Sequence, residues 1–177
     1  MNWHYYFQTV GTHYYYIDRS VVKLPDNLPM PPTNDFSSLF YNCWRLQDIT
    51  ALSNWDTSKV TDMSYMFLGC LYLRDISALA NWNVSNVRNM THLFGECVSL
   101  QDISALTNWD TSNVTNMDFM FTDCKELRDI TALSSWDTGN VKDMSQMFYE
   151  CRQLQDITAL SNWNVSKVEN TYCMFGD

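Results

Sequence analysis

Six cysteines are the residues of this sequence that most suggest chemistry, because thiolates bind metals and form disulfides. Five of them recur at a constant 27-residue step in apolar surroundings: Cys43, Cys70, Cys97, Cys124 and Cys151. No Cys-x-x-Cys pair and no Cys/His ligand set is present, so we expect buried, reduced thiols rather than a metal site or disulfides. The sixth, Cys173, stands outside this column, and we expect it to be more exposed and more reactive.

Five aspartates keep the same 27-residue step and form a column of carboxylates: Asp48, Asp75, Asp102, Asp129 and Asp156. Like charges in neighbouring coils repel one another, so each carboxylate needs a partner. We expect hydrogen bonds from backbone or hydroxyl groups, or ion pairs with the adjacent Arg74 and Arg128. The alternative is a ladder of divalent cations, because carboxylate oxygens are ligands that suit Ca²⁺.

Enzymatic chemistry is not expected from this sequence. The three histidines, His4, His13 and His92, lie in no recognisable acid–base or nucleophile setting. The sequence contains no G-x-S-x-G, no phosphate-binding loop and no G-x-G-x-x-G. We therefore expect a protein that is not an enzyme and that holds no metal and no other cofactor.

An internal repeat must position these residues. The segment "NWDTSNVTNMDFMF", residues 108–121, recurs in closely similar form one 27-residue step upstream and one such step downstream. The same step relates columns of Trp, Phe, Leu and Ile, for example Trp82 to Trp109 and Phe94 to Phe121. A constant period of this length indicates stacked coils that bury their apolar sides together.

The repeat predicts a solenoid of mixed α/β class, in which short parallel strands and short helices stack in 27-residue coils. The Asp-Ile-Ser/Thr segments, such as residues 75–77, suit short parallel strands, and residues 63–70 suit a helical turn or short helix. Residues 34–177 contain four full units and a partial unit at each end.

Residues 1–33 do not repeat. Aromatic and β-branched segments flank Gly11 and Thr12, which predicts a β-hairpin with a two-residue turn, followed by a Pro-rich connection. We expect this hairpin to cover the open end of the solenoid, because exposed ends of repeat arrays need caps. The alternative is an aromatic platform for a ligand.

The net charge of −9 excludes some partners. Charges in residues 1–33 cancel, so the excess of carboxylates lies in residues 34–177. Such a surface repels phosphates, and we expect neither direct nucleic-acid binding nor membrane insertion. No secretory signal is visible, and five retained thiols favour a reducing compartment; both favour an intracellular location, in a bacterial or phage-infected cell.

The core pattern F67-x-x-C70-x-x-L73-x-x-I76 and its copies resemble the BspA-like class of leucine-rich repeats, a bacterial surface-protein repeat of about 26 residues. This resemblance extends over residues 34–177. It implies a leucine-rich-repeat solenoid whose Leu-x-x-Ile segments form a parallel sheet. It also implies binding or adhesion rather than catalysis, and a location at the cell surface.

Columns that vary between units are free to specify a partner. On the expected helical side and the corner after it, the candidates are Tyr65, His92, Phe119, Tyr72 and Tyr149. On the expected sheet side they are Arg74, Arg128, Asp75, Asp102 and Asp129. The sequence does not indicate which of the two faces binds.

Two functions fit these observations. The first is a protein-binding or adhesion module that uses an extended solenoid face. The second is a small intracellular inhibitor, of phage origin, whose acidic solenoid blocks the nucleic-acid-binding groove of a host defence protein. In either case the partner is a protein. The C-terminal end has no obvious cap in the sequence, which favours a homodimer formed through that end.

Overall fold

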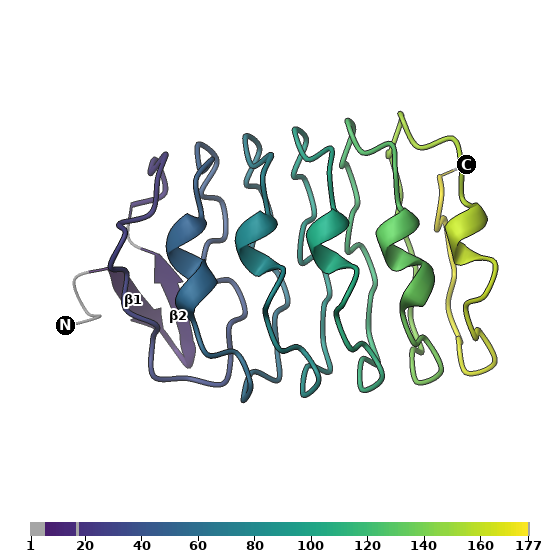
Figure 1. The fold of residues 1–177 in the computed structure, drawn as a ribbon, viewed down its shortest axis with the longest axis horizontal. Coiled ribbons are helices and arrows are strands. Elements are labelled where there is room, and N and C mark those ends of the chain that lie inside the picture. Colours follow the sequence, from purple (N-terminus) through teal and green to yellow (C-terminus); the bar gives the residue numbers. More distant parts are fainter. Residues whose placement is uncertain (1–5, 17, 177) are drawn as a thin grey trace.

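The computed structural model describes residues 6–16 and 18–176 and shows successive coils of the chain stacked side by side along the long axis (Figure 1). At one end lies an antiparallel hairpin of β1 (Phe7–Val10) and β2 (His13–Tyr16). Each later coil carries one 3₁₀ helix, and these are η2 (Thr50–Asn54), η3 (Ser77–Leu79), η4 (Ser104–Leu106), η5 (Thr131–Ser135) and η6 (Thr158–Leu160). No α-helix occurs within the described ranges, and no helix there is long and apolar enough to cross a bilayer.

Backbone hydrogen bonds join each coil to the next along residues 62–69 and their equivalents. The amides of Met63, Tyr65, Phe67 and Gly69 donate to carbonyl oxygens of the following coil at 2.8–3.0 Å. Parallel bridges join one position of every coil: Asp35 to Asp62, Asp62 to Asn89, Asn89 to Asn116, Asn116 to Asp143, and Asp143 to Asn170. This backbone ladder sets the spacing at which like side chains stack.

Two expectations about local structure differ from this arrangement. Residues 63–70 do not form a helix, because Tyr65 and Gly69 adopt positive φ of 59° and 76°. A residue in this left-handed region cannot continue a right-handed helix, and here it turns alternate amides toward the next coil. The Asp-Ile-Ser/Thr segments, expected as strands, instead lead directly into the 3₁₀ helices, with Ile76 at φ −114° and ψ 18°.

The constant columns form the core. The prediction that the five column cysteines are buried is confirmed, and the Trp, Phe, Leu and Ile columns are buried in the inner coils. The Sγ of Cys97 donates to the carbonyl oxygen of Phe67 at 3.3 Å, and the indole N–H of Trp109 donates to that of Leu79 at 3.1 Å. Both bonds recur at the equivalent positions of neighbouring coils, so these columns also satisfy buried backbone oxygens.

Three Asx turns form the corners of each full coil. In one coil the Oδ1 atoms of Asp62, Asp75 and Asn83 accept backbone N–H bonds from the residues two positions later, at 2.8, 2.8 and 3.0 Å. Asp and Asn favour such turns because their short side chains mimic a backbone turn. The Asn/Asp/Ser-rich corners of the repeat therefore have a structural origin.

The hairpin packs on the first coil. Gly11 and Thr12 connect the two strands, and Gly11 has the positive φ of 64° that the tight turn requires. The amide of Tyr16 donates to the carbonyl oxygen of Leu39 at 2.6 Å, and Phe7 packs edge-on against Phe40 at 6.2 Å. The hairpin thus satisfies one backbone carbonyl of this coil and packs on its apolar side. Residues 1–5, which include His4, lie outside the described residues.

Candidate protein-binding surface

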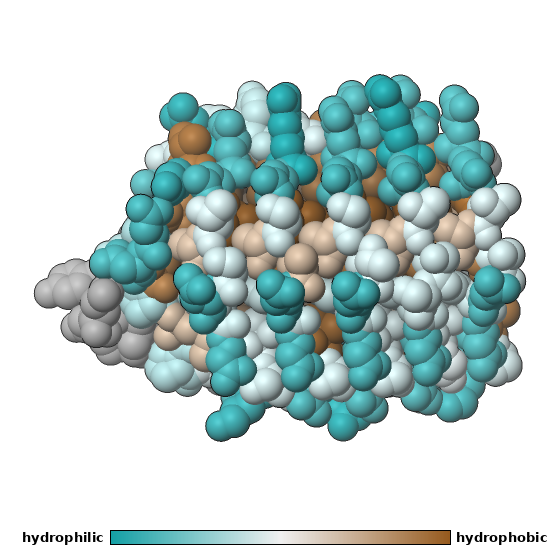
Figure 2. All heavy atoms as spheres, in the orientation of Figure 1, coloured by the Kyte–Doolittle hydropathy of each residue, from teal (hydrophilic) through white to brown (hydrophobic). Residues whose placement is uncertain are grey.

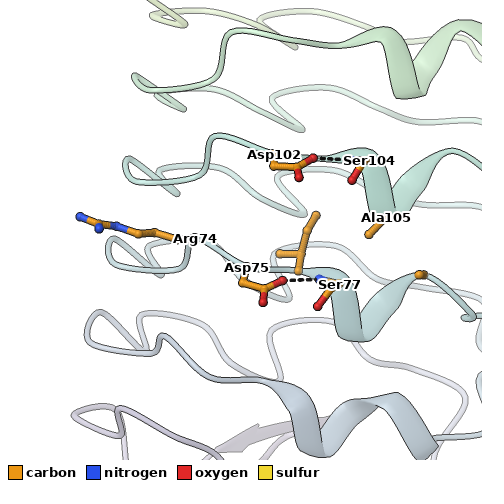
Figure 3. A pocket seen from close by; sticks show the side chains of 8 residues that line it. Arg74, Asp75, Ser77, Asp102, Ser104 and Ala105 are labelled. Carbon is orange, nitrogen blue, oxygen red and sulfur yellow. Dashed lines mark hydrogen bonds between the residues drawn. The ribbon is translucent and has the colours of Figure 1, made fainter.

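The aspartate column lies in a row of shallow hollows beside the 3₁₀ helices. The hollow between Asp75 and Asp102 has a volume of about 320 Å³. Figure 3 shows these two aspartates in it together with Ser77 and Ser104. Similar hollows lie between Asp48 and Asp75 and between Asp102 and Asp129. The face that carries the helices has hydrophilic side chains along both long edges and a paler band between them (Figure 2).

These carboxylates have a structural partner. The Oδ1 atoms of Asp75, Asp102 and Asp129 accept hydrogen bonds of 2.7–2.8 Å from the backbone N–H groups of the first residues of the 3₁₀ helices. Of the two partners considered from the sequence, the backbone is the one observed. Arg74 points away from Asp75 and Asp102 (Figure 3), and the Nη2 of Arg128 lies 3.7 Å from the Oε2 of Glu126. Across the described ranges, no group of three or more His, Cys, Asp and Glu side chains could hold a metal ion.

The varied column on the backbone-ladder side forms a stack of rings, here called the aromatic ladder, from Tyr65, His92 and Phe119. The ring centroids lie 5.1 Å apart between Tyr65 and His92 and 4.4 Å apart between His92 and Phe119, with nearly parallel planes. All three residues have φ between 52° and 59°. The left-handed backbone at this position points each side chain outward, so the rings stack on the surface and not in the core.

Neighbouring columns join the aromatic ladder. A Cβ at Gly95 would lie 2.9 Å from the Cδ1 of Leu68 and 3.0 Å from the Nδ1 of His92, so a side chain there would require these neighbouring side chains to shift. This glycine lets Leu68 lie close to the ring stack. At the following corner, exposed Tyr72 packs against exposed Trp44 at 6.4 Å. The coils near the hairpin therefore present several aromatic side chains.

The remaining predicted residue of this side, Tyr149, lies apart from them. It lines an open hollow near the C-terminal end with Glu150, Arg152 and Phe175. Nine of the ten predicted site residues are thus divided among three regions: the aromatic ladder with its corner, the aspartate hollows, and the C-terminal end. The tenth, Arg128, lies beside Glu126 and lines none of the hollows described here. The structure does not bring them into one site.

Sequence reasoning missed a hollow at the hairpin end of the aromatic ladder. It has a volume of about 450 Å³, is here called the ring hollow, and is lined by Val10, Tyr15, Arg19, Ser38, Tyr41 and Tyr65. Ser38 and Tyr41 occupy varied columns one step before Tyr65 and Leu68, so the 27-residue step extended backward would have found them. The residues from the hairpin carry no such signal, because the hairpin does not repeat.

The electrostatics of the aromatic ladder reflect its partial burial. Burial lowers the pKa of the His92 imidazole, and the nearby carboxylate of Asp118 opposes this shift. Burial, and then Asp118 and Asp62, raises the pKa of the Tyr65 hydroxyl. The Nδ1 of His92 has no hydrogen-bond partner among the described residues. A neutral His92 is therefore favoured between its two aromatic neighbours.

One family model, described as "Mycoplasma protein of unknown function, DUF285", matches residues 34–132 and 101–177. The two matched segments overlap and together extend over the whole repeated region. No curated protein and no solved structure matches the chain.

Proposed function

The chain belongs to the DUF285 family, and we propose that it is a non-enzymatic protein-binding module of the leucine-rich-repeat-like solenoid class. The proposed contact surface is the aromatic ladder, Tyr65, His92 and Phe119, with the adjacent corner that carries Trp44 and Tyr72. The binding role covers adhesion as well as intracellular interaction, since both use the same extended surface.

The observation that carries this proposal is the contrast between constant and varied columns. The constant apolar columns are buried, and their Cys and Trp members satisfy backbone groups. The varied column instead stacks half-buried His92 and Phe119 with exposed Tyr65 at the surface. Exposed aromatic side chains that gather on one surface are typical of protein–protein contacts, because they bury much area at low cost in side-chain entropy. Because each ring stands on a coil tied to its neighbours by backbone bonds, the surface is preorganised.

Two triple variants, one at the aromatic ladder and one at the aspartate hollows, test this function. Tyr65→Ser/His92→Ser/Phe119→Ser removes the rings and leaves a residue that the chain itself uses at this backbone conformation, at Ser38. We expect this variant to lose the proteins that the unmodified protein captures and cross-links in host lysate, while the unfolding transition stays cooperative. Unchanged capture by the ring-free variant would contradict the proposal.

The acidic inhibitor is the second candidate, and the observation in its favour is the free charge of the aspartate hollows. The carboxylates of Asp75, Asp102 and Asp129 form no ion pair within the described part of the chain. The variant Asp75→Asn/Asp102→Asn/Asp129→Asn keeps the Asx turns, because Asn83 forms the same turn. If the partner has a basic groove, this variant loses binding and the ring-free variant keeps it.

The exposed apolar surface of the last described coil is a candidate site for a second copy of the chain. In the last described coil Ile157 and Phe175 are 45% and 48% exposed, whereas their equivalents in the inner coils are at most 2% exposed. We propose that a second copy covers this apolar end. Light scattering at tens of micromolar tests it, and a monomer mass of 20.7 kDa would count against the dimer.

A further inference from the structure

The aromatic ladder ends at the coil next to the hairpin. Ser38 holds the ladder position in that coil, at φ 60°, and its short side chain places no ring against Tyr65. One face of the Tyr65 ring stacks on His92, which belongs to the following coil. The opposite face therefore looks back toward the coil of Ser38, where the next ring of the stack would lie.

The space beside Ser38 is open and lined by aromatic groups. The ring hollow is lined by Ser38 and Tyr41 of the coil next to the hairpin and by Tyr65 of the following coil. Tyr15 and Val10 of the hairpin line its other side. Val10 is among the most exposed apolar residues of the molecule, with 61% of its surface accessible. The hairpin therefore adds a partly apolar wall beside Ser38, where the next ring of the aromatic ladder would lie.

We propose that the ring hollow binds one aromatic side chain of a protein partner, which stacks on Tyr65 in the place left by Ser38. This inference rests on the proposed protein-binding function and names the chemistry of the partner at that surface.

The spacing of the coils is the reason why a ring fits better than an aliphatic chain. Successive members of the aromatic ladder lie 4.4–5.1 Å apart with nearly parallel planes, which is the separation of stacked aromatic pairs. A planar group that continues this stack meets the free face of Tyr65 at the same spacing. A branched aliphatic side chain can contact the same face of Tyr65 but gains no aromatic stacking there.

Arg19 adds polar recognition at the rim of the ring hollow. Its guanidinium lies 5.7 Å from the centroid of the Tyr41 ring, and it forms no ion pair within the described ranges. The N–H groups of this guanidinium can donate to the backbone carbonyl oxygens that flank an inserted side chain. A partner segment would therefore be held by one ring and by its own main chain.

The chain offers a variant that closes the ring hollow from inside. Ser38→Tyr supplies the missing ring, and the chain already places Tyr65, His92 and Phe119 at the same backbone conformation without rearrangement. Gln146→Tyr is the matched control, because Gln146 has φ 52° in the same column, on the far side of Phe119 from the ring hollow. It adds the same ring to the stack and leaves the ring hollow open.

Nuclear magnetic resonance titration with N-acetyl-L-tyrosinamide tests the site directly. We expect saturable shifts of the backbone amides of Ser38, Tyr41 and Tyr65 in the unmodified protein and in Gln146→Tyr, and no such shifts in Ser38→Tyr. Tyr65→Ser, an independent second variant, should raise the Kd about threefold to tenfold, which corresponds to the contribution of one stacked aromatic pair. Equal binding by Ser38→Tyr, or the same shifts with N-acetyl-L-alaninamide, would overturn the proposal.

Selection from a displayed random-peptide library then decides the source of the ring. Peptides enriched on the unmodified protein should contain an aromatic residue, lose binding when that residue is changed to alanine, and fail to bind Ser38→Tyr. Enriched peptides that bind Ser38→Tyr equally well would overturn this inference and leave the wider protein-binding function standing. A site that takes the tyrosinamide but enriches no aromatic peptide would refute a protein source for the ring.

Discussion

Replacing Phe94 with alanine should destabilise the protein far more than the same replacement of Phe175, although the two residues belong to one column. Phe94 is fully buried and stacks on Phe67 and Phe121, each at 5.7 Å. Phe175 is 48% exposed and stacks on Phe148 alone, also at 5.7 Å. The comparison therefore holds residue type and spacing constant and changes only burial and the number of stacked rings.

The expected difference follows from these two quantities. Removing a fully buried phenylalanine costs about 3–5 kcal/mol, because transfer energy is lost and a cavity is left. At Phe175 roughly half of the transfer energy of about 1.5–3 kcal/mol is at stake, and no closed cavity forms. Because Phe175 stacks on a single ring, we expect Phe175→Ala to cost about 1–2 kcal/mol.

Urea denaturation followed by circular dichroism, with the slope of the transition compared among variants, measures both changes. A thermal scan should show the same order, with Phe94→Ala shifted by at least about 2 °C more than Phe175→Ala. Equal shifts, or a larger shift for Phe175→Ala, would refute the stacked arrangement of this column. A separate early transition in Phe175→Ala would instead show that the last coil unfolds by itself.

Three further outcomes are expected. Trp109→Ala, in the middle of the stack, should lower the free energy of unfolding in urea by about 3–5 kcal/mol. Trp163→Ala should lower it less, because Trp163 has a neighbouring coil on one side only. Equal losses would count against the stacked arrangement. Under native conditions a maleimide should label half-buried Cys173 first and Cys97 last, because burial raises the pKa of the Cys97 thiol well above its ordinary value. Rapid labelling of Cys97 would show that the cysteine column does not lie in the core. Stability should fall as pH drops below about 6.5, since the unfolded chain protonates His92 before the folded protein does, and His92→Gln should reduce this dependence; an unchanged pH profile would contradict the assigned burial.

The sequence by itself determined which side chains pack together. A 27-residue step that never slips places Cys70 over Cys43 and Phe94 over Phe67 whatever the backbone does between them, because identical coils can bury their apolar sides only by stacking. The Gly11-Thr12 pair likewise indicated the hairpin, because glycine at the first turn position permits the positive φ of a two-residue loop.

Only the tertiary structure decided which side of each coil carries the backbone ladder. Apolar spacing of three is the same for a 3₁₀ turn and for a segment with left-handed residues four apart, as at Tyr65 and Gly69, so residues 63–70 and 75–79 could not be told apart from the sequence. Hydrogen bonds between coils select the left-handed backbone at Tyr65 and His92, and this choice turns their rings outward. The ring hollow depends on a further non-local fact: the hairpin residues Val10 and Tyr15 meet Ser38 and Tyr65 across distances in sequence that no period connects.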